Sequence, residues 1–446
     1  SQGRPSHRCS GSNIRVDTRG REVMRILPRN HDGVNEEWLA DRSRYIWDGL
    51  RRQRLDRAYV RVAGKLKPAS WSEAFAAIVR AQKAAGENIA AVAGDLAPIE
   101  AMWALKSLMA SLGSDRVECR QDGTKVAPGS RSAIVGTARI EDLDTADGVL
   151  LIGTNPRTEA PVLNARIRKA WLAGAEVAMI GEPVDLTYAT HQVGLGPEAL
   201  LGESRAELLT NMEGMASKVI VVGQGALTRP DGAAILGHAM ALAEEGGAKL
   251  MVLHTAAARV GGLDIGFAHP DGLACLDGAG FVWNLGADEC EMPEGAFVVY
   301  QGHHGDRGAH RAEVILPGAA YTEQPGLFVN TEGRVQMAVR AGFPPGDAKE
   351  DWAILRAVSA ELGQTLPFNR LDDLRAQLFD VHPHLAEIDQ IAEADWQPVP
   401  AGEMDRAPIQ NVISDHYLTN PISRASQMMA EMSRLAQDRT HAMAAE

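Results

Sequence analysis

Two glycine-containing turns carry the side chains whose types and spacing could do chemistry. The first, Gly153-Thr154-Asn155-Pro156-Arg157, follows the apolar run 149–152 and precedes a helical pattern. In a parallel sheet, a strand-to-helix turn presents backbone N–H groups and the positive end of a helix dipole, which favour a phosphate. Arg157 adds a guanidinium group for a bidentate contact. The run lacks G-x-G-x-x-G and G-K-[ST], so a capped turn with surface arginines is the alternative.

The second turn, Gly302-His303-His304-Gly305-Asp306, follows the apolar run 296–300. Its glycines let the backbone approach a ligand or another chain closely. Two histidines and an aspartate are metal-ligand types, but adjacent side chains rarely converge on one ion, and no third histidine follows at a standard spacing. We predict no metal here. The loop is either packed structure with hydrogen-bonded histidines or a contact for a ligand or partner.

No catalytic centre is visible elsewhere. The sequence lacks a G-x-S-x-G nucleophile elbow, an H-E-x-x-H motif and a convincing acid–base carboxylate pair. No two of the four cysteines have C-x-x-C spacing; they are Cys9, Cys119, Cys275 and Cys290. That spacing excludes a cysteine cluster for zinc or iron–sulfur. We predict neither a catalytic residue nor a metal ligand, and we expect the cysteines to be small buried side chains in a reducing compartment.

Short buried strands that alternate with helices must position these turns. Apolar runs without alternation are typical of strands buried on both faces. They lie at 148–153, 176–181, 218–223, 249–253, 280–286, 296–300 and 313–316. Helical patterns between several of them predict parallel sheets with helices on both sides. The runs outnumber the strands of one nucleotide-binding sheet, which indicates two α/β subdomains.

The remaining segments complete the predicted organisation. Alternation over 13–27 predicts a hairpin, Ser70 and Glu73 form a capping box for a helix, and Asn420 starts a last helix with a methionine stripe. The predicted parts are an unmatched leader at 1–11, a β-rich segment at 12–66, two α/β subdomains at 67–345 and a mainly helical region at 346–446.

Composition limits the function classes. The chain has 446 residues, of which 45% are hydrophobic and 23% charged, as in ordinary globular proteins. No run approaches the roughly 18 apolar residues that a membrane span needs. The net charge of −13 argues against a nucleic-acid partner, because nucleic-acid binders usually carry a basic face.

Several longer motifs, taken in order, resemble one family. They are SNIRVDTRGREVMRILP at 12–28, NEEW at 35–38, GTNPRTEAP at 153–161, GEPVDLT at 181–187, YQGHHGD at 300–306, VILPGAAYTE at 314–323, VNTEGR at 329–334 and SRASQ at 423–427. The set resembles the C-terminal, molybdopterin-oxidoreductase-like part of the large peripheral-arm subunit of respiratory complex I. That subunit is the NADH–quinone oxidoreductase relative of molybdopterin enzymes. The resemblance runs from about residue 11 to about residue 435.

The resemblance implies a fold and a vestigial pocket. The fold is an α/β, molybdopterin oxidoreductase-like body with several parallel-sheet subdomains and a helical C-terminal segment. Active relatives hold a molybdopterin guanine dinucleotide at their strand-end loops, and the complex I branch resembles one that kept the body and lost the cofactor. The retained cofactor-binding residues would then be Gly153, Thr154, Asn155, Arg157, Gly302, His303 and His304.

The resemblance also implies where the family's iron–sulfur clusters lie. We expect its 4Fe-4S and 2Fe-2S clusters in an N-terminal region that is absent here. Ala40 stands where active enzymes carry a cluster cysteine. No cofactor is therefore expected in this chain.

The implied function is a scaffold within a proton-translocating NADH–quinone oxidoreductase, which passes electrons from NADH through flavin and iron–sulfur clusters to quinone. The chain itself would have no independent catalytic activity. Its partners would be the flavoprotein and iron–sulfur subunits, with the membrane arm contacted indirectly. The expected location is the cytoplasmic side of a bacterial inner membrane, or the mitochondrial matrix side.

Two alternatives stay open. One is a functional molybdopterin-dependent oxidoreductase, for which Cys119 is the least unsuitable metal ligand. The other is a stand-alone nucleotide-binding module.

Overall fold

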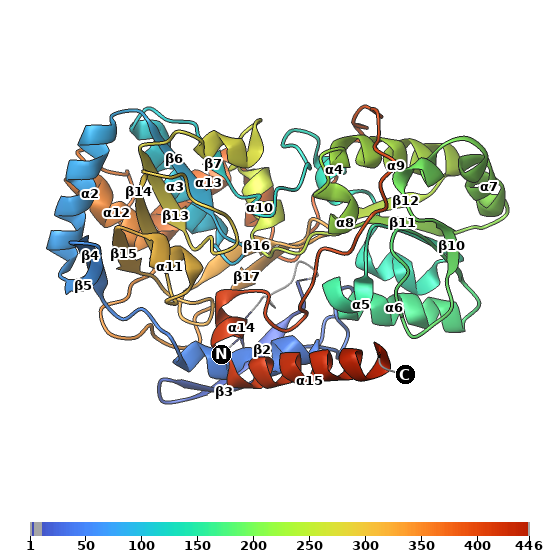
Figure 1. The fold of residues 1–446 in the computed structure, drawn as a ribbon, viewed down its shortest axis with the longest axis horizontal. Helices are drawn as coiled ribbons and strands as arrows, with labels where there is room; N and C mark the ends of the chain where they lie inside the picture. Colours follow the sequence, from blue (N-terminus) through green and yellow to red (C-terminus); the bar gives the residue numbers. More distant parts are fainter. Residues whose placement is uncertain (1, 4–10, 445–446) are drawn as a thin grey trace.

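Two largely parallel sheets lie side by side in the computed structural model, which describes residues 2–3 and 11–444. A seven-stranded sheet occupies the left half of Figure 1 and a five-stranded sheet the right half. Cys9 and most of the predicted leader lie outside the described residues. The two sheets position the strand-end turns that the sequence singled out.

The five-stranded sheet is parallel throughout. Its strands, in spatial order, are β10 (His191–Gly194), β9 (Glu176–Ile180), β8 (Gly148–Ile152), β11 (Lys218–Val222) and β12 (Lys249–Val252). The central strands β8 and β11 are almost fully buried, because helices cover both faces of the sheet. The covering helices include α5 (Pro156–Glu159), α6 (Pro161–Leu172), α7 (Gly202–Met212), α8 (Gln224–Leu227) and α9 (Gly232–Gly246).

The seven-stranded sheet is parallel except where β4 pairs antiparallel with β15 and with β5. Its order is β5 (Lys65–Ala69), β4 (Ala58–Val62), β15 (Val314–Pro317), β14 (Phe297–Gly302), β13 (Phe281–Leu285), β6 (Ile89–Ala93) and β7 (Val117–Glu118). The chain leaves this sheet after β7, builds the five-stranded subdomain, and returns at β13. The surrounding helices are α2 (Trp71–Ala85), α3 (Ile99–Ser111), α4 (Arg131–Val135), α10 (Arg259–Asp264), α11 (Arg307–Arg311) and α12 (Asp351–Glu361).

Both sequence signals that began these elements work as expected. Ser70 and Glu73 form the predicted capping box at the start of α2. Every apolar run proposed as a buried strand forms one, with ends within two residues of the prediction. The molybdopterin oxidoreductase-like α/β fold is confirmed. The proposed domain boundary at residue 66 falls within β5, which pairs with β4 in one sheet.

A small antiparallel sheet and a short helical stretch form the N-terminal segment. The sheet contains β1 (Gln2–Gly3), β2 (Ile14–Arg19) and β3 (Glu22–Pro28), and the predicted hairpin joins β2 to β3. Helix α1 (Asp41–Tyr45) continues into the 3-10 helix η1 (Ile46–Arg51). A separate hairpin, β16 (Gly326–Val329) and β17 (Val335–Ala338), lies between this segment and the large sheets.

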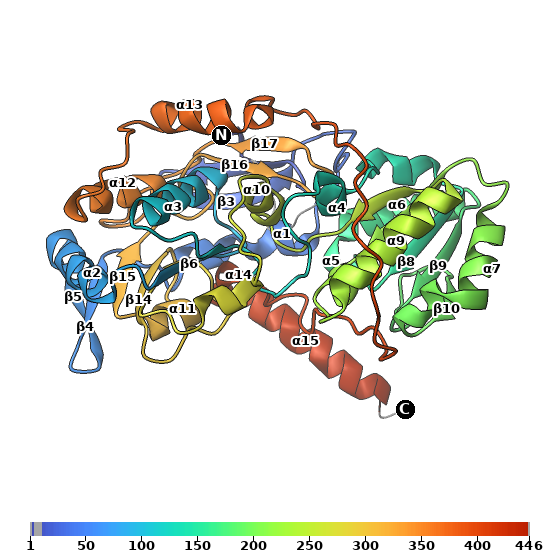
Figure 2. The ribbon, with the colours of Figure 1, turned by 90° about the horizontal axis from the view of Figure 1, so that it is seen from above.

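The C-terminal region combines helices with a long irregular segment. After α13 (Leu371–Val381), residues 392–420 run without helix or strand; we call them the strap. Figure 2 shows the strap crossing the five-stranded subdomain beside α9. The strap departs from the mainly helical structure predicted for 346–446.

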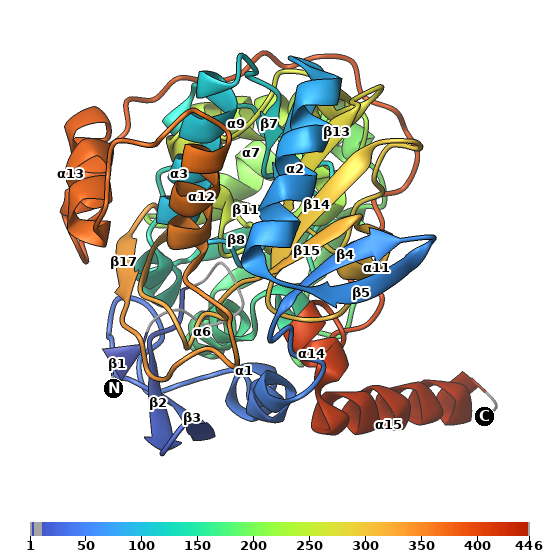
Figure 3. The ribbon, with the colours of Figure 1, turned by 90° about the vertical axis from the view of Figure 1, so that its left-hand side faces the viewer.

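The predicted last helix is in fact two helices, α14 (Pro421–Ala425) and α15 (Gln427–Ala444). The break has a clear cause at Asp48 in η1. Its carboxylate accepts hydrogen bonds from Ser426 Oγ and from the backbone N–H groups of Gln427, at 2.8 Å, and Met428, at 3.3 Å. Asp48 therefore caps α15 from another part of the chain. Figure 3 shows α15 extending away from the body.

Residues 2–3 and 11–444 contain no helix that is both long and apolar enough to cross a membrane.

Candidate functional site

The predicted phosphate turn lies at the carboxyl end of β8. Gly153 has a φ of +57°, and a Cβ atom there would lie 2.5 Å from the backbone nitrogen of Ala226. Only glycine accepts both this conformation and this approach. Thr154 is buried, and a Cβ atom on Gly223 would lie 2.3 Å from its Cβ atom. The turn is thus packed tightly against the carboxyl end of the neighbouring strand β11.

Asn155 and Arg157 have different surroundings. Asn155 precedes α5, and its backbone N–H donates to Glu159 Oε1 over 2.8 Å. The Arg157 guanidinium group is about half exposed and donates to the Asp185 carboxylate over 2.6 Å. A backbone hydrogen bond from Thr187, together with Arg157, holds the pKa of Asp185 below its ordinary value. Arg157 is therefore engaged at the surface.

The strap crosses the strand ends where a parallel sheet normally binds ligands. Its Ile409 donates to the carbonyl of Leu195 and accepts from the N–H of Glu182, over 2.8 and 2.9 Å. A Cβ atom on Gly225, just after β11, would lie 2.5 Å from the carbonyl oxygen of Gln410. The chain thus places its own backbone over this end of the five-stranded sheet.

The histidine loop after β14 joins the seven-stranded sheet to the N-terminal segment. His304 is fully buried, and burial lowers its pKa to about 3, so its ring is neutral. Its Nε2 atom lies 2.8 Å from the carbonyl oxygen of Gly49 and donates to it, which leaves Nδ1 to accept from His303 Nδ1 over 2.6 Å. The carbonyl of His303 accepts from the N–H of Leu55 over 3.1 Å. Both histidines are thus used in packing. That either turn contacts a ligand stays a prediction.

A buried carboxyl group lies behind the same loop. Asp288 accepts hydrogen bonds from the Tyr300 hydroxyl over 3.0 Å and from the backbone N–H of Gly308 over 2.9 Å. Burial raises the pKa of Asp288 to about 7, and the Asp306 carboxylate adds to the shift while Arg424 opposes it. The group therefore binds a proton in the folded chain at pH values where an unfolded aspartate is ionised.

This shift predicts a pH-dependent effect of Asp288→Asn. Because the folded pKa is raised, the stabilising contribution of Asp288 is complete below about pH 4 and is lost as the pH rises through about 7. An asparagine can keep both hydrogen bonds without ionising. Urea unfolding should therefore show the variant gaining on the wild type by roughly 2–4 kcal/mol between pH 4 and pH 8. A flat difference across that range would contradict the shift. The exposed Asp277→Asn change is the matched control.

The largest described cavity, of about 570 Å³, lies where the carboxyl ends of both parallel sheets face each other. Asp95, after β6, and Glu289, after β13, line it from the seven-stranded side. Gln224, after β11, and Thr255, after β12, line it from the five-stranded side. Strap residues 412–415 and 418–420 close it. The cavity therefore stands at the strand-end position that the fold offers for a ligand.

Buried ion pairs form the wall of this cavity on the seven-stranded side. The fully buried Arg259 lies with Nη2 at 3.0 Å from Asp122 Oδ1 and at 3.9 Å from Asp95 Oδ1. Burial raises the pKa of Asp95 to about 6, although Arg259 opposes that shift. On the strap side, Arg424 contacts Glu289 at 2.6 Å and Asp306 at 2.7 Å.

The cysteines hold no visible metal site. Cys119 and Cys275 are buried, and burial raises the pKa of each thiol to about 12, which keeps both protonated. No group of three or more histidine, cysteine, aspartate or glutamate side chains in the described part of the chain could hold a metal ion.

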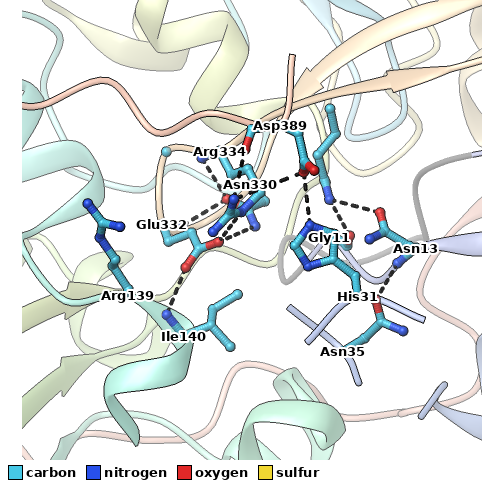
Figure 4. Close-up of polar contacts among 12 residues, drawn as sticks. Gly11, Asn13, His31, Asn35, Arg139, Ile140, Asn330, Glu332, Arg334 and Asp389 are labelled. Atoms are coloured by element: carbon cyan, nitrogen blue, oxygen red, sulfur yellow. Dashed lines mark hydrogen bonds and ion pairs between the residues drawn. The ribbon is translucent and has the colours of Figure 1, made fainter. Parts of the chain in front are cut away.

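The VNTEGR motif forms a polar junction between distant segments, shown in Figure 4. The buried Glu332 carboxylate accepts from the backbone N–H of Ile140 and from Arg334 Nε, each over 2.8 Å. Arg334 in turn donates to the carbonyl of Asp389 over 2.8 Å, and the Asp389 carboxylate lies 2.9 Å from His31 Nε2. The motif therefore joins the N-terminal segment, the five-stranded subdomain and the C-terminal region.

Sequence reasoning missed most residues of the cavity wall. Asp95, Gln224 and Glu289 each follow a predicted strand by no more than four residues, so their place at strand ends was a usable signal. Arg42 and Asp415 carried no comparable signal, because they reach the cavity from the N-terminal segment and the strap.

Family models match three successive stretches of the chain. The model for molybdopterin oxidoreductase matches residues 54–361, which is more than half of the chain. The model for the NADH-ubiquinone oxidoreductase NDSU1/NuoG-like 4Fe-4S domain matches residues 9–48. A model for the C-terminal region of the corresponding NADH-ubiquinone oxidoreductase subunit matches residues 381–432. The resemblance inferred from the motifs is confirmed.

Two similar proteins are mitochondrial. The NADH-ubiquinone oxidoreductase 78 kDa subunit of Neurospora crassa is 40% identical over 451 residues, which covers 95% of this chain and 61% of the relative. The NADH dehydrogenase (ubiquinone) iron-sulfur protein 1 of Solanum tuberosum is 38% identical over 443 residues, covering 95% and 60%. The chain thus spans about three fifths of the length of these curated relatives.

One solved structure is similar in fold. Acetylene hydratase from Pelobacter acetylenicus superposes with a TM-score of 0.57 at 11% identity, covering 88% of this chain and 74% of that chain. At this identity the likeness concerns the fold alone.

The match at residues 9–48 corrects one prediction. The expected absence of the family's iron–sulfur region is wrong, because the 4Fe-4S domain model matches within this chain. The region escaped notice because Cys9 is the single cysteine in the matched stretch, so no ligand spacing marks it. A 4Fe-4S cluster is held by four thiolates. This stretch therefore does not supply a complete ligand set by itself.

The cavity also does not fit the dinucleotide that the resemblance implies for active relatives. Its lining contains five carboxylates, Asp95, Asp122, Glu159, Glu289 and Asp415, against three guanidinium groups, Arg42, Arg307 and Arg424. Such a wall repels the pyrophosphate of a pterin dinucleotide. The strap further occupies the glycine-rich strand ends that would approach it.

Proposed function

Since the chain belongs to the molybdopterin oxidoreductase family, we propose that it is the scaffold part of the large peripheral-arm subunit of a proton-translocating NADH–quinone oxidoreductase. The observation that carries the proposal is the pair of terminal matches, at 9–48 and 381–432, to models named for that oxidoreductase. In the whole complex, electrons pass from NADH through flavin and iron–sulfur clusters to quinone. The proposed role of this chain is to hold neighbouring parts in place.

The buried polar contacts support a scaffold role. The junction around Glu332 and the loop of His303 and His304 both join the N-terminal segment to the large sheets. These contacts would keep the stretch that matches the 4Fe-4S domain in a constant position relative to the body. Each of their groups serves packing, which supports the view that the chain has no independent catalytic activity.

Exposed apolar side chains support a docking edge near the N-terminal segment. Trp38 is 56% exposed and Tyr45 43%, and both belong to the stretch that matches the 4Fe-4S domain. Leu435 on the neighbouring helix α15 is 43% exposed. We propose that the flavoprotein and iron–sulfur subunits of the complex dock on this side, and that contact with the membrane arm is indirect. The side of the membrane, cytoplasmic or mitochondrial matrix, stays a prediction.

Affinity purification of the tagged, full-length chain from its own cells tests the proposal. We expect the chain to co-purify from gently solubilised membranes with an assembly that oxidises NADH and reduces quinone, while the separated chain does neither. A variant with Trp38→Ala should reduce recovery of the assembly, and the exposed Leu172→Ala change on α6 is the matched control.

Recovery of the chain alone, with stoichiometric molybdenum by elemental analysis, would overturn the proposal and favour a functional molybdopterin-dependent oxidoreductase. Saturable nucleotide binding by a chain that joins no assembly would instead favour a nucleotide-binding module.

A further inference from the structure

The cavity between the two sheets has more hydrogen-bond acceptors and negative charge than its own partners satisfy. Five carboxylates line it against three guanidinium groups. Arg259, behind the wall, is largely engaged by Asp122 at 3.0 Å. The lining therefore keeps an excess of negative charge even when this fourth guanidinium group is included.

A fully buried side chain points independently to a missing donor. Gln224 is 0% exposed, and its Nε2 atom donates to the carbonyl of Leu253 over 2.9 Å. Within the described residues, its Oε1 atom is buried and has no hydrogen-bond partner. The Oδ1 atom of Asp95, across the cavity, is likewise buried without a hydrogen bond there. Such acceptors are costly to leave unsatisfied, so each requires a donor.

The size and remaining lining of the cavity indicate the class of donor. A water molecule occupies about 30 Å³ of liquid volume, whereas this cavity holds about 570 Å³. Leu96, Val412, Ile413 and Leu418 add apolar surface between the charged groups. A hydrated metal ion has no use for such surface, but an alkyl chain does. Arg307, whose side chain is 68% exposed, lies at the rim and shows that the cavity communicates with solvent.

We propose that this cavity binds a linear alkylamine that carries two or more ammonium groups. One ammonium group would donate to Asp95 on the seven-stranded side, and another to Gln224 on the five-stranded side, with the alkyl spacer along the leucine side chains. Such a ligand would bridge the two subdomains. Because the contacts to the carboxylates are charge-assisted, they carry most of the affinity.

Calorimetric titration of the full chain with spermidine tests this proposal. At about 0.15 M salt, which screens the surface charges, we expect saturable binding near one spermidine per chain. The neutral 1,8-octanediol, of similar length, should not bind. Asp95→Asn should weaken spermidine binding by about tenfold or more, as expected for a lost charge-assisted contact. The exposed Asp277→Asn change should leave it unaltered.

Three results would overturn the proposal. They are the absence of saturable spermidine binding by the wild-type chain, equal losses in the two aspartate variants, and binding of Mg²⁺ with the same affinity and stoichiometry. The last two would show non-specific attraction to an acidic protein. Thermal melting of each variant checks its folding, and Asp415→Asn in the strap, which should also weaken binding, replaces Asp95→Asn if that variant does not fold.

Discussion

Replacing Glu332 with alanine should lower the free energy of unfolding by about 3–5 kcal/mol. The side chain of Glu332 is fully buried, and the change leaves the Arg334 guanidinium group, only 12% exposed, without its carboxylate. It also leaves the backbone N–H of Ile140 without an acceptor. A buried charge that loses its partner keeps its full desolvation penalty. Urea unfolding followed by tryptophan fluorescence measures the change.

The matched control is Glu387→Ala, which removes an exposed carboxylate from the same region of the chain. It should change stability by less than about 0.5 kcal/mol. If Glu332→Ala cost no more than this control, the junction in Figure 4 would not be a stabilising contact. Partial trypsin digestion gives a second readout, because losing the junction should expose the N-terminal segment to cleavage before the sheets.

Replacing Arg54 with alanine should cost a similar amount, about 3–5 kcal/mol. Its guanidinium group forms two parallel contacts of 2.5 Å with the Glu323 carboxylate, and the two side chains are 9% and 10% exposed. Arg54 also donates to the carbonyl groups of Leu50 and His303, over 2.9 and 3.1 Å. Lysine cannot reproduce this planar set of donors, so Arg54→Lys should recover only part of the loss.

A double-mutant cycle with Glu323→Ala isolates the ion pair. Removing both partners should cost clearly less than the sum of the two single changes, because neither charge is then left buried alone. Additive effects would contradict a direct pair. Arg57→Ala, at an exposed arginine three residues away, serves as the control and should leave stability nearly unchanged.

The regular elements were predictable from the sequence because they follow from local properties. A strand buried on both faces must be apolar at successive positions, so runs such as 148–153 and 218–223 identified β8 and β11. The capping box at Ser70 and Glu73 located α2 for a similar reason, since its hydrogen bonds join residues three apart. The family resemblance then supplied the fold class, and it rested on whole motifs in order.

The strap and the broken last helix were not predictable in this way. Residues 392–420 have no periodicity, because their backbone is held by partners such as Glu182 and Leu195 on another subdomain. The end of α14 depends on Asp48, which lies 378 positions from Ser426. No local pattern encodes a cap supplied from so far away. The 4Fe-4S match at 9–48 was missed for a related reason, since a cysteine count tests ligand spacing and not the surrounding sequence.

The sequence by itself determined the strands, most helices, the family and the lack of a recognisable catalytic motif. Only the tertiary structure decided what the strand-end residues face. It turned Arg157 to the surface, buried His304 beneath the N-terminal segment, and gathered Asp95, Gln224 and Asp415 around one cavity. The physical reason is that secondary structure depends on neighbours along the chain, whereas charge balance and burial depend on which distant segments meet. The cavity's acidic character is a property of that meeting.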